Sequence, residues 1–184
     1  MEHTLRQYNN ELEACRSLFL KKTEDYGTSW RILRPSSLTD QIFIKASRIR
    51  SIDEKGISKV EEPLDDAFRA MVNYGIMALV QLSLPLDDMQ DTELELDVVI
   101  AQYDKFETIV RDLMIAKNHD YGEAWRDMRI SSMTDLVLMK LLRIKQIEEN
   151  DGVTTVSEGL DSNYMDIINY ALFCLIKLTE SKQK

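Results

Sequence analysis

The chain has 184 residues, 44% of them hydrophobic and 30% charged, which predicts a packed core in one domain or two small ones and excludes a largely disordered chain. Its net charge of −9 argues against general affinity for duplex nucleic acid, because neutralising backbone phosphates takes a basic surface. No apolar run approaches the length of a membrane span, and the first residues lack the apolar stretch of a signal peptide, so we expect no membrane segment and a cytoplasmic protein.

The first predicted helix covers 5–24, where apolar residues such as Leu12 and Phe19 recur at helical spacing. An equivalent helix is predicted over 95–118, because the chain contains an internal repeat. Comparing 21–54 with the segment 95 positions later gives 16 identities in 34 positions. One residue inserted in the second copy changes the offset to 96, and the match then continues. Such self-similarity indicates a duplication.

A polar loop follows each of these helices and carries the residues that the two copies share most closely. Its candidate ligand-binding residues are Lys22, Asp25, Tyr26 and Trp30 in the first copy, and Lys117, Asp120, Tyr121 and Trp125 in the second. The glycine after each Tyr suits a helix end with positive φ, and the Tyr and Trp rings offer flat surfaces on which a nucleobase can stack. The alternative is a Lys–Asp salt bridge at the helix end, with the aromatic side chains closing over the core.

The second predicted helix covers 38–54 and, in the second copy, 133–149, with Ser37 or Ser132 as its N-cap. The pattern K-x-x-R places two cations on one face of this helix. These cations are Lys45 and Arg48 in the first copy, and Lys140 and Arg143 in the second. They can bind a phosphate, for which Arg provides a bidentate fork. Alternatively, they neutralise carboxylates of the third helix as structural ion pairs.

The third predicted helix covers 63–83 and 159–180 and carries a polar stripe on an otherwise apolar surface. The acids of this stripe are candidate ligands of Mg²⁺, because the ion binds carboxylate oxygens and completes its shell with water and substrate phosphate. They are Glu62, Asp65 and Asp66 in the first copy, and Glu158, Asp161 and Asp166 in the second. The alternative for the acids near the helix start is a solvated first turn, which the helix dipole favours. Asp166 and the paired Asn73 and Asn169 lie deeper in the helix and need buried partners.

These elements predict an all-α helical bundle built from two three-helix repeats, 1–84 and 95–184, joined by an acidic linker over 85–94. We expect a pseudo-twofold axis between the repeats, as in a fused homodimer, with the third helices buried at the centre. The chain would then act as a monomeric pseudo-dimer or form a homodimer. Because Ala70 replaces the acid found at Asp166, and Ser162 replaces the acid found at Asp66, we also expect composite sites shared by the two third helices.

The motif K-x-x-D-Y-G-x-x-W, followed by K-x-x-R, E-x-x-D and N-Y, resembles the nucleotide modification associated domain family over roughly 8–83 and 103–179. This resemblance implies a small-molecule nucleotide as ligand and a role in nucleotide metabolism or nucleic-acid base modification. A more distant similarity is to the all-α nucleoside triphosphate pyrophosphohydrolases of the MazG type, which implies Mg²⁺ as cofactor and nucleotide phosphohydrolysis as the enzymatic option.

The chain departs from the MazG pattern in one respect. The E-x-x-E pair of the preceding helix is missing, and Lys140 and Arg143 occupy that region. The competing hypothesis is therefore a non-catalytic helical interaction module whose polar stripes are internal ion pairs.

Overall fold

The computed structural model describes residues 2–84, 92–153, 155 and 158–183, and in these residues it contains α-helices and two short 3₁₀ turns but no β-strand. The helices are α1 (Glu2–Tyr26), α2 (Pro35–Lys55), α3 (Leu64–Ser83), α4 (Leu96–Tyr121), α5 (Ile130–Glu149) and α6 (Leu160–Lys182). The 3₁₀ turns, η1 (Ser29–Ile32) and η2 (Ala124–Asp127), hold the two tryptophans. The predicted all-α bundle is confirmed, and none of the helices described is long and apolar enough to cross a membrane.

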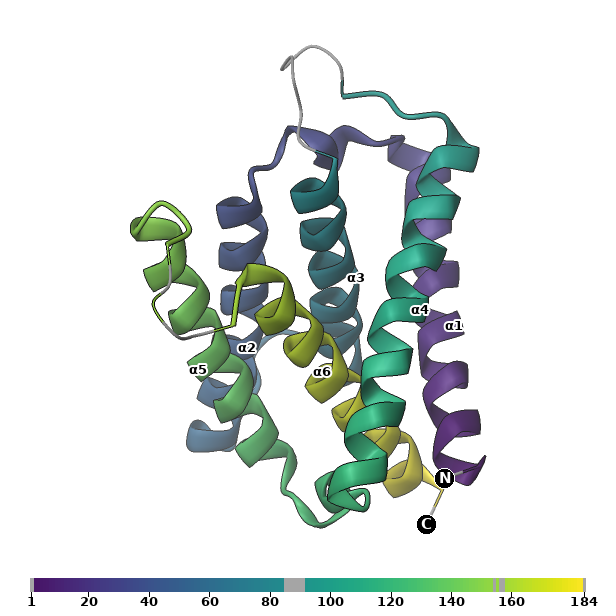
Figure 1. Ribbon diagram of the computed structural model, residues 1–184. Coiled ribbons are helices and arrows are strands. Elements are labelled where there is room, and N and C mark those ends of the chain that lie inside the picture. Colours follow the sequence, from purple (N-terminus) through teal and green to yellow (C-terminus); the bar gives the residue numbers. More distant parts are fainter. Residues whose placement is uncertain (1, 85–91, 154, 156–157, 184) are drawn as a thin grey trace.

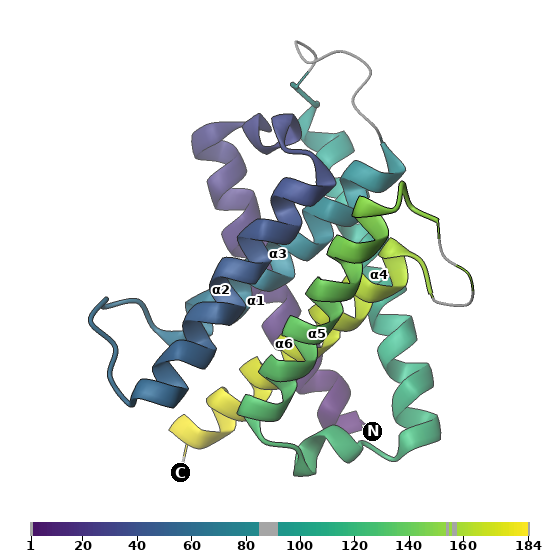
Figure 2. The same cartoon turned by 90° about the vertical axis from the view of Figure 1, so that its left-hand side faces the viewer.

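The six helices form three layers, each with one helix from either repeat (Figure 1). α1 and α4 lie on one side, α3 and α6 in the middle, and α2 and α5 on the other side, and the turned view in Figure 2 shows α5 lying beside α6. The expectation that the third helices are central is confirmed, because α3 and α6 are buried along most of their length and pack most extensively against each other. Outside the polar stripe, their broad apolar surfaces exclude water only in this middle layer.

The two central helices approach each other closely at Gly75 of α3. A Cβ atom added to this glycine would lie 2.6 Å from Cγ1 of Ile168 on α6. The glycine therefore lets the backbone of α3 come within contact distance of the Ile168 side chain. The equivalent residues in the other repeat are Ala171 and Val72, so this close approach is not repeated with the same residues.

Two buried tyrosines connect the repeats through reciprocal hydrogen bonds. The hydroxyl of Tyr8 donates to Oδ1 of Asn169 at 2.7 Å, and the hydroxyl of Tyr103 donates to Oδ1 of Asn73 at 2.9 Å. Each asparagine amide then donates to a backbone carbonyl on the first helix of its own repeat. The prediction that both asparagines have buried partners is confirmed. The reciprocity is what a pseudo-twofold relation between the repeats requires, and the axis itself stays a prediction.

The start of the second helix differs from the prediction. α2 begins at Pro35 and α5 at Ile130, so Ser37 and Ser132 lie inside the first turn and are not caps. Pro35 suits the first helical turn, where its missing N–H has no role. The glycines after the two tyrosines have the expected positive φ of 61°. Of the predicted acidic linker, 85–91 lies outside the described residues.

Candidate functional site

In the second repeat, two lysines bind the same buried carboxylate. Nζ of Lys117 lies 2.5 Å from Oδ1 of Asp166, and Nζ of Lys140 lies 2.6 Å from Oδ2. The three residues come from α4, α5 and α6, so this ion-paired cluster connects all three helices of the repeat. Glu158 is a distant fourth member, 3.9 Å from Lys140 and 63% exposed.

The cluster has the charge balance that burial demands. Asp166 has 9% of its side chain exposed and Lys140 has 11%, so either charge alone would be costly. Burial lowers the pKa of Lys117, but the hydrogen bond and charge of Asp166 outweigh it, and the net pKa of this lysine is raised. The lysines predicted to bind a ligand are therefore held, in this repeat, by an acid predicted to bind metal. The contact between Lys140 and Asp166 is the structural ion pair that the alternative reading of the second helix predicted.

A cavity of about 320 Å³ borders this cluster and is lined largely by aromatic and apolar side chains. It lies between α4, η2 and α6, and its lining residues include Lys117, Asp166, Tyr121, Trp125, Tyr170 and Phe173. Both Tyr121 and Trp125 were predicted as ligand-binding residues, and the structure brings them to one cavity with Lys117.

The two predicted aromatic residues differ in accessibility. Tyr121 is 72% exposed, whereas Trp125 is 5% exposed. The Trp125 ring stacks on Phe173 with 4.3 Å between centroids, and the Arg126 guanidinium lies 4.5 Å from its centroid. A base therefore has Tyr121, not the faces of Trp125, on which to stack. The indole N–H of Trp125 is buried and has no acceptor among the residues that the structure describes.

In the first repeat, residues of α1, α2 and α3 and of the segment before α3 line a cavity of about 360 Å³. Lys22 and Lys45, the equivalents of Lys117 and Lys140, both line it, together with Glu62 and Asp66. Ala70 occupies the position of Asp166, so no carboxylate joins the two lysines at that point.

In this repeat, Glu62 pairs with both cations of α2, Lys45 and Arg48. Lys45 donates to Oε1 of Glu62 at 2.7 Å, and Arg48 donates to the Glu62 backbone carbonyl at 2.8 Å and lies 3.6 Å from its Oε2. The Lys45 hydrogen bond lowers the pKa of Glu62. Lys22, by contrast, makes no ion pair or hydrogen bond within the described part of the chain.

The neighbouring acids of α3 are also paired. Asp65 contacts Arg69 at 3.0 Å and Lys182 at 3.2 Å, and Asp66 contacts Arg69 at 3.4 Å. Burial raises the pKa of Asp65, but hydrogen bonds from Lys182 and Arg69 outweigh it and lower the net pKa. Among the residues described, no three acidic, histidine or cysteine side chains gather in a way that could hold a metal ion. Of the predicted metal ligands, Glu62 and Asp66 line one cavity and Asp166 lines the other.

The remaining predicted residues lie at the surface. Asp25, Tyr26, Asp120, Arg143 and Asp161 are exposed and line neither cavity. Asp120 contacts the ring of His119 at 3.0 Å and not Lys117, so the predicted Lys–Asp salt bridge at this helix end does not form.

Trp30 packs edge-on against Phe19, and the space around it in the first repeat is filled by Leu94, Val99 and Tyr103. Among the residues that the structure describes, the aromatic cavity of the second repeat therefore has no open counterpart around Trp30.

The two cavities that contain predicted site residues are each lined by one repeat alone, which corrects the expectation of composite sites. Asp66 borders the cavity of the first repeat and Asp166 the cavity of the second. The repeats meet instead through the apolar faces of α3 and α6 and the two Tyr–Asn hydrogen bonds. The sequence pattern could not show this, because the rotation of each central helix about its axis decides which neighbour its polar stripe faces.

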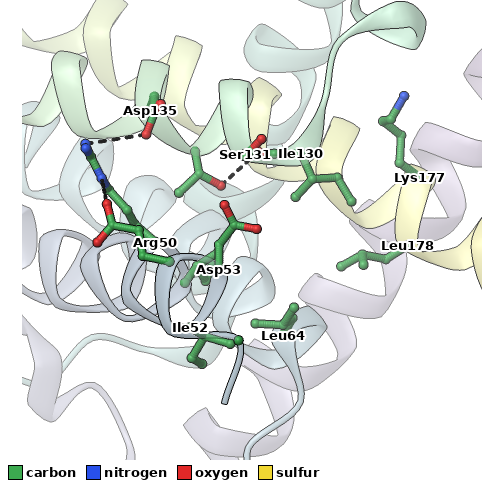
Figure 3. Close-up of a pocket in the computed structure, with 13 residues that line it drawn as sticks. Arg50, Ile52, Asp53, Leu64, Ile130, Ser131, Asp135, Lys177 and Leu178 are labelled. Carbon is green, nitrogen blue, oxygen red and sulfur yellow. Dashed lines mark hydrogen bonds and ion pairs between the residues drawn. The ribbon is translucent and has the colours of Figure 1, made fainter. Parts of the chain in front are cut away.

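A third cavity, of about 740 Å³, lies away from every predicted site residue. It opens where the C-terminal end of α2, the start of α5 and the C-terminal end of α6 meet (Figure 3). Arg50 of α2 and Asp135 of α5 pair at 3.5 Å along one side, while Ile52, Ile130 and Leu178 supply apolar surface. No sequence motif points to this cavity, because it forms only where the two repeats meet.

A protein-family model described as nucleotide modification associated domain 1 matches residues 22–82 and 117–178. The two segments cover well over half of the chain, and the chain belongs to this family. One segment falls in each repeat, which supports the tandem arrangement, and the name of the family suggests a role in nucleotide modification. No curated protein and no solved structure matches the chain. The distant likeness to MazG-type enzymes therefore stays a prediction.

Proposed function

We propose that this member of the nucleotide modification associated domain 1 family binds a nucleotide in the aromatic cavity of its second repeat. The observation that carries the proposal is the convergence of the exposed Tyr121 ring and the partly exposed Lys117 ammonium group on one cavity lined largely by aromatic and apolar side chains.

Tyr121 provides the surface on which a base would stack. It lines the cavity and is 72% exposed, so a planar ligand can cover it without displacing a neighbour. Stacking of a base on an aromatic side chain contributes about 1–3 kcal/mol and tolerates different bases. Asn118 provides a further hydrogen-bonding group, because among the described residues its side-chain amide donates only to the sulfur of Met114, a weak acceptor. The expected ligand is therefore a flat heterocycle with a hydrogen-bonding edge.

Lys117 places a positive charge beside this base site. Its ammonium group has three donors, of which one is used by Asp166. The side chain is 45% exposed, so the remaining donors can reach a phosphate at the mouth of the cavity. A nucleotide then has a base partner and a phosphate partner within one cavity, which free base or free phosphate would use only in part.

In the proposal, Mg²⁺ binds in the first repeat, together with a phosphate group. Glu62 and Asp66 line one cavity there, and two carboxylates with water and phosphate oxygens can complete the shell of Mg²⁺. Glu62 must leave Lys45 to do so, so we expect Mg²⁺ to bind together with a phosphate and not before it. Phosphohydrolysis, with water activated by such an ion, is the reaction that these residues would support.

The competing function is a helical module whose ion pairs only hold the helices together. The pairing of Lys45 with Glu62, and of Lys140 with Asp166, favours it. It differs from the proposal in one measurable respect, because it needs neither the Trp125 cavity nor an exposed Tyr121.

Isothermal titration calorimetry with nucleoside monophosphates and triphosphates, with and without Mg²⁺, tests the proposal. Tyr121→Ala should weaken binding about tenfold, because base stacking is lost. The matched control is Tyr26→Ala at the equivalent position, since Tyr26 is 73% exposed but lines neither of the two cavities, and it should leave binding unchanged. Absence of binding at millimolar nucleotide, or equal losses in the two variants, would refute the proposal.

A further inference from the structure

The two repeats treat one position of the central helix in opposite ways. In the second repeat Asp166 lies between two lysine ammonium groups, with contacts of 2.5 and 2.6 Å. In the first repeat Ala70 stands at that position, while the equivalent Lys22 and Lys45 remain and line the same cavity. The duplicated helices thus preserve a pair of cations, and only one repeat supplies the anion between them.

We infer that Asp166 is a built-in anion, and that the cavity of the first repeat binds a phosphate or pyrophosphate group from solution between Lys22 and Lys45, where Ala70 leaves room. The geometry of the second repeat shows the arrangement, since two lysines on neighbouring helices both reach the oxygens of one carboxylate. A phosphate oxygen accepts the same charge-assisted hydrogen bonds. The chain then has one anion site and one self-neutralised copy of it.

The described carboxylates that line the first cavity pair with cations other than Lys22. Glu62 is engaged by Lys45 and Arg48, and Asp66 is engaged by Arg69, a residue replaced by Met165 in the second repeat. Within the described residues Lys22 has no carboxylate partner, although its counterpart Lys117 has one. An anion would pair with Lys22, and it would share Lys45 with Glu62.

This inference goes beyond the nucleotide site of the second repeat, because it concerns another cavity and an anion without a base. The choice of ligand in the titration separates the anion site from the nucleotide site. Inorganic pyrophosphate reports on the first repeat even if no base binds to the chain, and a nucleoside without phosphate reports on the aromatic cavity alone.

The test is calorimetric titration of the full chain with inorganic pyrophosphate. We expect one bound pyrophosphate per chain, and a loss of about tenfold or more in affinity for Ala70→Asp, whose new carboxylate would take both lysines. Ala70→Asn is the matched control of nearly equal size without charge, and it should bind pyrophosphate more tightly than the Asp variant does. Lys22→Ala should lose binding, whereas Lys21→Ala, next to it on the exposed surface, should not.

The converse change is Asp166→Ala, which should raise the stoichiometry from one pyrophosphate to two by opening the second copy. If this variant is too unstable to titrate, the Ala70 and Lys22 variants decide the matter by themselves. The inference is overturned if the natural chain does not bind pyrophosphate, if Ala70→Asp binds it as well as the natural chain does, or if Ala70→Asn and Ala70→Asp lose binding equally.

Discussion

The hydroxyl of Tyr8 on α1 donates to the side-chain oxygen of Asn169 on α6, 161 residues later, at 2.7 Å. The equivalent Tyr103 on α4 donates to Asn73 on α3 at 2.9 Å. Each bond joins the first helix of one repeat to the third helix of the other. The repeats are therefore held together by polar contacts that neither repeat can make alone, and separating them would leave two buried asparagines without donors.

Tyr8→Phe and Tyr103→Phe should each lower the free energy of unfolding by about 1–3 kcal/mol, because each leaves a buried acceptor unsatisfied while keeping the ring. Urea denaturation followed by circular dichroism measures the change. Tyr26→Phe is the control, since its hydroxyl is on an exposed ring, and it should change stability by less than about 0.5 kcal/mol. Losses no larger than the control would show that the reciprocal bonds do not stabilise the fold.

Gly75→Ala should destabilise the chain by about 1–3 kcal/mol, because the new methyl group would overlap Ile168 at the centre of the bundle. Ile168→Ala removes the Cγ1 atom that the new methyl group would overlap, so the double variant should lose less stability than the sum of the two single variants. Thermal unfolding of the single and double variants checks the coupling. Equal stability of the single variant and the natural chain would mean that α3 and α6 are not in close contact at this point.

Lys140→Met should cost about 3–5 kcal/mol, since it removes the more buried of the two partners of Asp166. The double variant with Asp166→Leu should be clearly more stable than Lys140→Met alone, because no buried charge remains. Lys45→Met is the comparison in the first repeat, where the pair with Glu62 is more exposed, and it should cost about 0–1 kcal/mol. A similar cost at both lysines would contradict the different burial of the two pairs.

Glu62 should contribute stability only above a certain pH. The pKa of Glu62 is lowered in the folded chain by Lys45, so its contribution is complete above the unfolded pKa of about 4.3 and is lost as the pH falls through the lower folded value. Glu62→Gln should therefore be less stable than the natural chain at pH 7, and the difference should shrink towards zero in more acidic solution. Glu61→Gln, an exposed neighbour, serves as the control. A difference independent of pH would rule out the ion pair as its cause.

Much of the fold was predictable, because periodicity and duplication are both properties of the sequence. The apolar surface of the third helices identified them as central, and the shared Asn73 and Asn169 had to find buried partners. The helix starts at Pro35 and Ile130 were not predicted. Serine is a preferred N-cap residue, so the serines that follow indicated a start further along the chain.

The candidate site was only partly predictable. Lys117 pairs with Asp166 and not with Asp120, since α4 is rotated to face α6, and no local spacing encodes that rotation. The covering of Trp125 by Phe173 joins residues far apart in the chain, which the spacing within the motif cannot show. The signal that was available is the exchange of Ala70 for Asp166, which marks the one position where two otherwise similar cavities differ in charge.

Trp125 lines the proposed nucleotide site, and the chain has only two tryptophans. Two indole N–H signals are therefore expected in a ¹⁵N correlation spectrum, and Trp30→Phe assigns them. Adding nucleoside monophosphate should shift the Trp125 signal, because this residue lines the cavity that the nucleotide would occupy, and should leave the Trp30 signal in place, because the space around that ring is filled. A Trp125 signal that stays fixed at saturating or millimolar nucleotide would contradict the account.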